Sequence, residues 1–99
     1  MPRPPIRQMK RQVAAGGRPN ACVDAVARAR ESALSLLTRS VTCGHTRLAI
    51  RRLSTAVQAN AAIPSQHWDH CRETASRSAD TDLIAMFLQA EQTAAGRRA

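Results

Sequence analysis

The sequence predicts an all-α protein, built as a small three- to four-helix bundle with a basic N-terminal arm. Along most of the chain, apolar residues recur at intervals of three and four, the spacing of one helix face. Nineteen of the 99 residues are alanine, which has the highest intrinsic helix propensity. Capping residues, glycines and prolines separate the periodic stretches and mark the expected helix boundaries. The length fits a single domain.

Residues 1–19 are expected to form a basic arm rather than a helix. They carry five positive and no negative side chains. Because proline and glycine recur so often here, we expect the segment to be disordered alone or ordered by a partner. The residues responsible are Pro2, Pro4, Pro5, Gly16, Gly17 and Pro19.

Residues 20–99 are expected to form the helical domain, beginning with helices over about 21–43 and 46–62. Asn20 is the expected N-cap of the first helix, and Gly44 is expected to end it. Thr46 is the expected cap of the second helix, which has to stop before Pro64.

Two further helices are expected over about 66–77 and 81–95. Ser65 is the expected cap of the first of them, and Trp68 is its expected core anchor. Residues 78–82 are rich in capping side chains, so the last helix is expected to start near 81 and to end at Gly96. Five large apolar residues within 83–88 cover nearly its whole circumference. Such a helix is either central in the bundle or contacts a partner on its second side.

The net charge of +8 is unevenly distributed along the chain. Residues 1–64 carry a net charge of +9 and residues 65–99 a net charge of −1. This asymmetry favours nucleic acid or another anionic surface as a partner. Fourteen of the fifteen basic residues are arginine, which binds phosphate with two parallel hydrogen bonds. A GC-rich genome would produce the same arginine bias without any function.

An arginine-rich helix face and the arm form the candidate nucleic-acid site. In the helix expected over 46–62, one face is apolar and the opposite face is basic, and no acidic residue occurs between Glu31 and Asp69. The alternative interpretation is an ordinary solvated surface. The residues expected to contact phosphates are Arg3, Arg7, Lys10, Arg11, Arg47, Arg51 and Arg52.

These features predict a non-enzymatic basic helical protein that binds DNA or RNA, as a regulator or a small ribonucleoprotein component. No carboxylate pair, nucleophilic triad or glycine-rich phosphate loop suggests an enzyme. The alternative is an accessory structural subunit of a larger protein complex. Large apolar side chains are few for a chain of 99 residues, so an oligomer or a complex subunit is expected rather than a marginal monomer.

A cluster of histidine and cysteine leaves a metal site open. On a helix, His67, His70 and Cys71 share one face, and their side chains suit zinc, copper or nickel. Cys43 or His45 completes the set if the bundle brings them close. The other interpretation is isolated histidines and a buried cysteine that acts as a small hydrophobe, so the main expectation is no cofactor.

The Cys43, His67 and Cys71 spacing resembles the Cys…His-x-x-x-Cys ligand pattern of CsoR/RcnR-type metal-sensing repressors, which are small, helical, oligomeric DNA-binding proteins. The resemblance implies a metal held by Cys43 of one subunit and His67 and Cys71 of another, with basic helix faces on DNA. A metal-responsive repressor is therefore a second alternative. Pro64 interrupts a stretch that this family builds as one continuous helix.

Cysteine content and hydropathy bear on the compartment. Three cysteines at scattered positions argue against a disulfide framework, so free thiols in an intracellular, reducing compartment are expected. The cytoplasm is the first expectation and an organelle matrix the second. No apolar run approaches the length needed to cross a bilayer, so no membrane span is expected.

Overall fold

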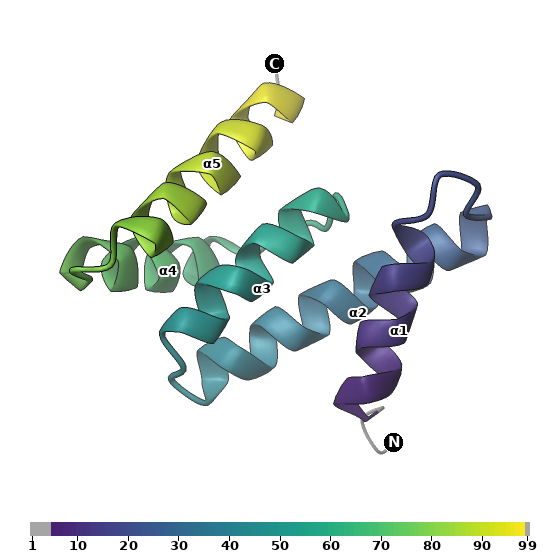
Figure 1. Cartoon of the computed structure of the whole chain (residues 1–99), viewed down its shortest axis with the longest axis horizontal. Coiled ribbons are helices and arrows are strands. Elements are labelled where there is room, and N and C mark those ends of the chain that lie inside the picture. The colour runs from purple at the N-terminus through teal and green to yellow at the C-terminus, as the bar shows by residue number, and fades with distance from the viewer. Residues whose placement is uncertain (1–4, 99) are drawn as a thin grey trace.

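A computed structural model describes residues 5–98 and shows an all-α fold with five helices in that range (Figure 1). The predicted fold class is confirmed, but the predicted number of helices, three to four, is too low. The helices are α1 (Ile6–Gly16), α2 (Val23–Thr42), α3 (Arg47–Gln58), α4 (Ser65–Arg77) and α5 (Thr81–Arg98).

The additional helix, α1, lies inside the segment that was expected to be an arm. Pro5 directly precedes it, Gly16 is its last residue and Gly17 follows it, so that residues 6–15 form a helix without an internal breaker. The first helical hydrogen bond runs from the backbone N–H of Met9 to the carbonyl oxygen of Pro5, over 3.1 Å. The expectation of a disordered or partner-ordered segment is therefore wrong for residues 6–16, because the proline and glycine residues bracket a helix rather than interrupt it.

Packing against α2 accounts for the stability of α1. Met9 is only 2% exposed, and the hydroxyl of Ser32 on α2 donates a hydrogen bond to Oε1 of Gln12. At the end of α1, Gly16 lies directly against α2. A methyl group on Gly16 would lie 2.8 Å from the carbonyl oxygen of Ala25 and would overlap the side chain of Ala29. The absence of a side chain at Gly16 thus permits the close approach of the two helices.

Both α2 and α3 end in a Schellman motif, in which the two residues after the cap donate back to the last turn. At the end of α2, Gly44 has a φ of +71°, and the backbone N–H of His45 donates to the carbonyl oxygen of Ser40 over 3.0 Å. At the end of α3, Asn60 takes the same place with a φ of +60°, and the N–H of Ala61 donates to Ala56 over 3.0 Å. Asparagine tolerates this left-handed backbone, which is why α3 ends at Gln58 and not near residue 62 as expected.

Two of the three expected N-caps differ from the observed ones. Cys22, and not Asn20, caps α2, and its sulfur accepts the backbone N–H of Ala25 over 3.4 Å. Thr46 takes the expected N-cap position of α3, but its own backbone is already near-helical and its side chain makes no capping bond. Ser65 is the first residue of α4, because Pro64 takes the cap position with an extended backbone.

The start of α5 agrees with the expected cluster of capping residues, whereas its end does not agree with the sequence. The carboxylate of Asp80 accepts the N–H of Asp82 over 3.0 Å, and the hydroxyl of Ser78 accepts the N–H of Asp80 at the same distance. The helix continues through Gly96 to Arg98. The glycine keeps a helical backbone there, so it does not terminate the helix.

The hydrophobic core lies among α2, α3, α4 and α5. Its most deeply buried members are Leu37, Ile50, Leu53 and Cys71, all with no exposed surface. Trp68 is half-buried at the edge of this core, where it packs edge-to-face on Phe87 with 6.3 Å between ring centroids. The remaining core volume is filled largely by alanines from every core helix: Ala33, Ala49, Ala56, Ala75 and Ala90.

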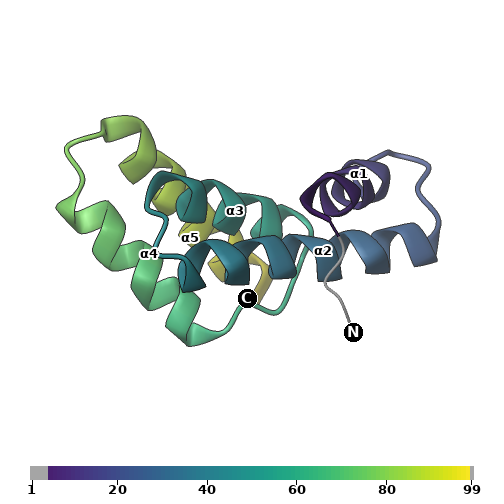
Figure 2. The same ribbon diagram turned by 90° about the horizontal axis from the view of Figure 1, so that it is seen from below.

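Figures 1 and 2 show how the helices are arranged around α2 and α3. In Figure 2, α1 and α3 lie on the same side of α2, while α4 and α5 lie at the end of the molecule away from α1. Arg97, close to the end of α5, donates a hydrogen bond to the carbonyl oxygen of Val57 in the last turn of α3. This bond places a positive charge at the negative end of the α3 dipole and joins the two helix ends.

We predict that Gly16→Ala weakens the docking of α1 on α2 and lowers the free energy of unfolding by about 1–3 kcal/mol, because the added methyl overpacks the crossing. Thermal unfolding followed by circular dichroism measures the loss, and trypsin cleavage at Arg7, Lys10 and Arg11 reports local undocking of α1.

Gly96→Ala is the matched control, because nothing lies within 4 Å of a methyl at that position. It is expected to raise stability by up to about 1 kcal/mol through helix propensity alone. A Gly16→Ala variant as stable and as protease-resistant as the wild type would contradict the described crossing.

Candidate nucleic-acid interface

The candidate phosphate-binding residues of α1 lie together on its exposed side. Arg7, Lys10 and Arg11 are spaced by three and four positions, so they share one helix face, and all three are exposed. No acidic residue occurs on α1. Arg3, the other residue expected to contact phosphate from this segment, lies outside the described residues. The helical conformation therefore converts three scattered charges into one basic face.

The three candidate arginines of α3 have three different environments. Arg51 is exposed. Arg47 is exposed as well, but one of its terminal nitrogens lies 3.2 Å from the carboxylate of Asp80. Arg52 is half-buried, its Nε is buried without a hydrogen-bond partner among the described atoms, and burial lowers its pKa. The expectation that all three arginines stand free on the side opposite the core is thus wrong for Arg52 and only partly right for Arg47.

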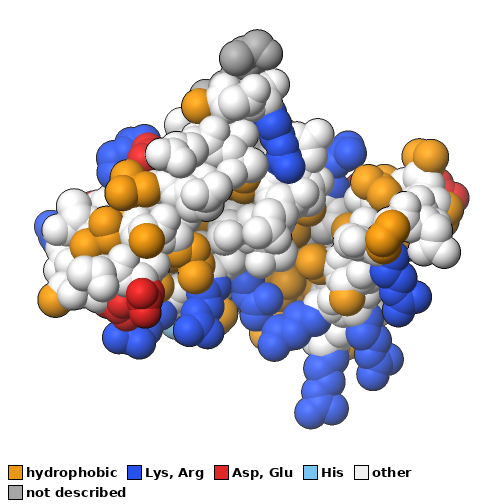
Figure 3. Space-filling view, turned by 45° about the horizontal axis from the view of Figure 1, so that its top comes forward, with side chains coloured by type: hydrophobic (Ala, Val, Ile, Leu, Met, Phe, Trp, Pro, Cys, Tyr) orange, Lys and Arg blue, Asp and Glu red, His pale blue; other side chains and the backbone are white. Residues whose placement is uncertain are grey.

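The space-filling view shows the resulting charge distribution on one side of the molecule (Figure 3). Lys and Arg side chains form a row along the lower edge of this view, whereas Asp and Glu side chains appear only near its left and right ends. We use the name basic face for the exposed cations that the sequence singled out on α1 and α3, two helices that lie on the same side of α2 in Figure 2: Arg7, Lys10, Arg11, Arg47 and Arg51.

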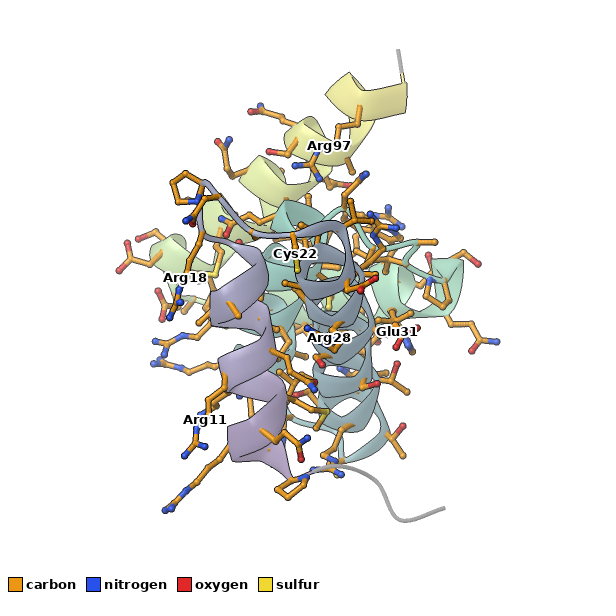
Figure 4. The ribbon with its side chains drawn as sticks, turned by 90° about the vertical axis from the view of Figure 1, so that its right-hand side faces the viewer. Arg11, Arg18, Cys22, Arg28, Glu31 and Arg97 are labelled. Carbon is orange, nitrogen blue, oxygen red and sulfur yellow. The ribbon has the colours of Figure 1, made fainter. Side chains whose placement is uncertain are left out.

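Two cations that the sequence did not single out lie near the basic face. Figure 4 shows Arg11 and Arg18 pointing to the same side of the molecule, while Glu31 points away on the far side of α2. Arg28 and Arg11 both line a groove of about 330 Å³ between α1 and α2. Arg28 lies on α2, and only the docking of α1 brings it beside Arg11.

The candidate metal ligands are spread over three different environments. Cys43 is exposed at the end of α2, and the ring of His70 reaches the carbonyl oxygen of His45 at 3.5 Å. His67 is buried and its Nε2 lies 3.0 Å from the hydroxyl of Thr38. Among residues 5–98, no three His, Cys, Asp or Glu side chains are placed to hold one metal ion. Metal binding therefore stays a prediction, and this arrangement does not bring its candidate ligands together.

Cys71 is the least available of these ligands. It has no exposed surface, and its thiol faces the carbonyl oxygen of Ala49 with 3.8 Å between sulfur and oxygen. Burial raises the pKa of this thiol to about 11, which disfavours the thiolate that binds metals. A site that shares Cys71 between two subunits, as in the CsoR/RcnR-type arrangement, therefore requires α4 to move away from α3.

No protein-family model, curated protein or solved structure matches this chain. Within the described part of the chain, no helix combines the length and the apolar character needed to cross a membrane.

Burial of His67 predicts a pH-dependent stability. Desolvation, with a smaller contribution from the positive charge of His70, lowers the pKa of His67 below its ordinary value of about 6.5. The folded state therefore favours the neutral ring, and the unfolded chain binds the proton more readily. We expect the free energy of unfolding to be highest above that ordinary value and to fall as pH drops through it toward the folded pKa.

Denaturant titrations of the wild type and of His67→Gln at a series of pH values measure this effect. The variant is expected to lose most of the decrease, whereas the control His45→Gln, at an exposed position, is expected to keep it. An equal decrease in the wild type and in His67→Gln would show that other groups are responsible.

Proposed function

We propose that this protein is a non-enzymatic nucleic-acid-binding protein that contacts phosphates through its basic face. The observation that carries the proposal is the grouping of Arg7, Lys10 and Arg11 on one exposed side of a helix without acidic residues. Arg51 adds an exposed cation from α3. A duplex or a folded RNA presents a closely spaced row of phosphates, which matches a row of cations on rigid helices.

Electrostatics supports the same proposal. The chain carries a net charge of +8, and residues 1–64, which include α1, α2 and α3, have a net charge of +9. Binding to phosphates releases condensed counterions, so the contribution of each contact to the affinity is large at low salt and small at high salt. The guanidinium groups present paired donors for phosphate oxygens. The proposed role is that of a regulator or a small ribonucleoprotein component.

The aromatic side chains favour backbone recognition over base stacking. The sequence has no tyrosine, and its single phenylalanine, Phe87, is 4% exposed in the core. The single tryptophan, Trp68, packs its ring against Phe87. Single-strand binding proteins stack bases on exposed aromatic rings, so we propose recognition of the phosphate backbone and of duplex or folded shape.

An accessory role in a protein complex is the second candidate, and one observation favours it. Leu88 is 50% exposed on α5, and the exposed Ala85 and Ala95 on the same side of the helix extend an uncharged surface from it. A purely structural subunit would bind neither DNA nor RNA at low salt, whereas the proposed function requires binding that weakens steeply as salt increases.

We predict that Arg7→Ala combined with Arg11→Ala weakens binding to duplex DNA and to structured RNA and lowers the slope of log affinity against log salt by about 2, roughly one per lost contact. Fluorescence anisotropy with labelled oligonucleotides at several salt concentrations measures both quantities.

The matched control is Arg72→Ala combined with Arg77→Ala, which removes the same charge from α4. Both arginines already pair with carboxylates, with 3.1 Å between Arg72 and Asp69 and 2.8 Å between Arg77 and Glu73. This control is expected to leave the slope nearly unchanged. Equal losses in the two double variants would mean that net charge alone, and not the basic face, drives binding.

We further predict that Asp80→Asn strengthens nucleic-acid binding up to about fivefold, because it frees Arg47 from its ion pair. An asparagine can still accept the N–H of Asp82, so the start of α5 keeps its cap. Asp69→Asn, which removes the same charge beside Arg72, is the control in the same anisotropy assay. If both variants bind equally more tightly, the effect is one of net charge and Arg47 is not a contact.

A further inference from the structure

The side of α5 that faces away from the core carries an uncharged strip. Leu83, Phe87 and Ala90 are buried on the inner side of this helix. On its opposite side, exposed residues recur at alternating intervals of four and three along the helix, the spacing of a coiled-coil seam. We call these residues the outer strip: Thr81, Ala85, Leu88, Gln92 and Ala95.

The outer strip has the composition of a helix–helix contact. Leu88 projects at its middle and is 50% exposed, while the alanines on both sides of it allow close approach of a second helix. Glu91, which flanks the strip, has its carboxylate 3.4 Å from Arg72. A groove of about 600 Å³ continues the strip toward α4, because Gln92 and Ala95 line it together with Trp68 and the charged side chains of Asp69, Arg72 and Glu91. The surface beyond α5 is therefore of mixed character.

The sequence left two explanations for the apolar residues of α5, a central position in the bundle or a partner on its second side, and the location of the helix distinguishes them. It packs on α3 and α4 with one side only and lies at the edge of the bundle (Figure 1). It is thus not the central helix, and the remaining explanation for its second apolar side is a partner surface.

The distribution of charge indicates what that partner is. Two copies of a chain with a net charge of +8 repel each other wherever their basic halves meet. Residues 65–99, which contain α4 and α5, have a net charge of only −1, and the outer strip itself is uncharged. This half is therefore where two copies can approach without strong repulsion.

The dipole of α5 favours one direction of pairing. Antiparallel helices place the N-terminal end of one α5 dipole beside the C-terminal end of the other. Parallel helices would align like dipole ends and would bring Asp82, in the first turn, close to Asp82 of the second copy. Antiparallel pairing also satisfies the two-fold symmetry of a homodimer.

We propose that the outer strip of α5 pairs with the outer strip of a second copy of this chain, antiparallel, with Leu88 at the two-fold axis. In this register Thr81 of one copy faces Ala95 of the other, and α1, the helix that carries Arg7, Lys10 and Arg11, does not contact α5. The pairing goes beyond the proposed function, and it is tested on the chain without nucleic acid.

Sedimentation equilibrium of the full chain, freed of nucleic acid, tests the pairing. The wild type is expected to be a dimer, and Leu88→Arg is expected to raise the dissociation constant by roughly 30-fold or more, because it buries unpaired charge at the centre of the interface. Val23→Arg adds the same charge at the most exposed large apolar residue, which is 84% exposed on α2, and is expected to leave the dimer intact. Circular dichroism verifies that both variants are folded.

Disulfide cross-linking tests the register in a chain whose exposed cysteines, Cys22 and Cys43, are replaced by serine. Leu88→Cys is expected to cross-link with itself on mild oxidation, as is a mixture of Thr81→Cys and Ala95→Cys chains, whereas Thr81→Cys alone is not. A monomer at all concentrations, which would leave the strip to a different protein, overturns the proposal. So does a dimer that Leu88→Arg leaves intact, or a Thr81→Cys chain that cross-links with itself.

Discussion

Close packing of helices through small residues is the constraint on which this fold depends. Gly16 lets α1 approach the backbone of α2, and alanines fill the positions where α2, α3, α4 and α5 meet. Small side chains bring helix axes close together, but each one buries little apolar area. The few large side chains, such as Leu37, Leu53 and Phe87, therefore supply most of the hydrophobic free energy. A fold of this kind has little reserve, so one added methyl at a crossing has a large effect.

The arginines of the different helices differ in the carboxylates that lie beside them. On α4 they are neutralised by carboxylates one helical turn away, as for Arg72 with Asp69 and Arg77 with Glu73. On α1 no carboxylate is present, and the basic face stays exposed. Arg47 lies between these cases, because the residue that caps α5, Asp80, also binds its guanidinium. One carboxylate thus serves both the start of a helix and the charge of the neighbouring surface.

The sequence predicted the helical class and much of the charge pattern, because both follow from local spacing. The prediction failed at α1, because the proline and glycine content of a segment is the same whether these residues bracket a helix or interrupt it. It also missed the turn at Asn60, where an asparagine takes the left-handed position that glycine takes at residue 44. The burial of the Arg52 Nε and the pairing of Arg47 with Asp80 depend on contacts between distant segments, which residue spacing does not contain.

The two proposed surfaces lie on different halves of the chain, and the charges of these halves would couple polyanion binding at one surface to pairing at the other. The basic face belongs to the half with a charge of +9, and the outer strip of α5 belongs to the half with a charge of −1. A polyanion bound to the basic face reduces the repulsion between two copies and therefore favours their pairing. Because such coupling is reciprocal, pairing favours polyanion binding by the same factor. The affinity of a dimer for a long nucleic acid would then exceed that of one chain, provided that both basic faces reach the same molecule.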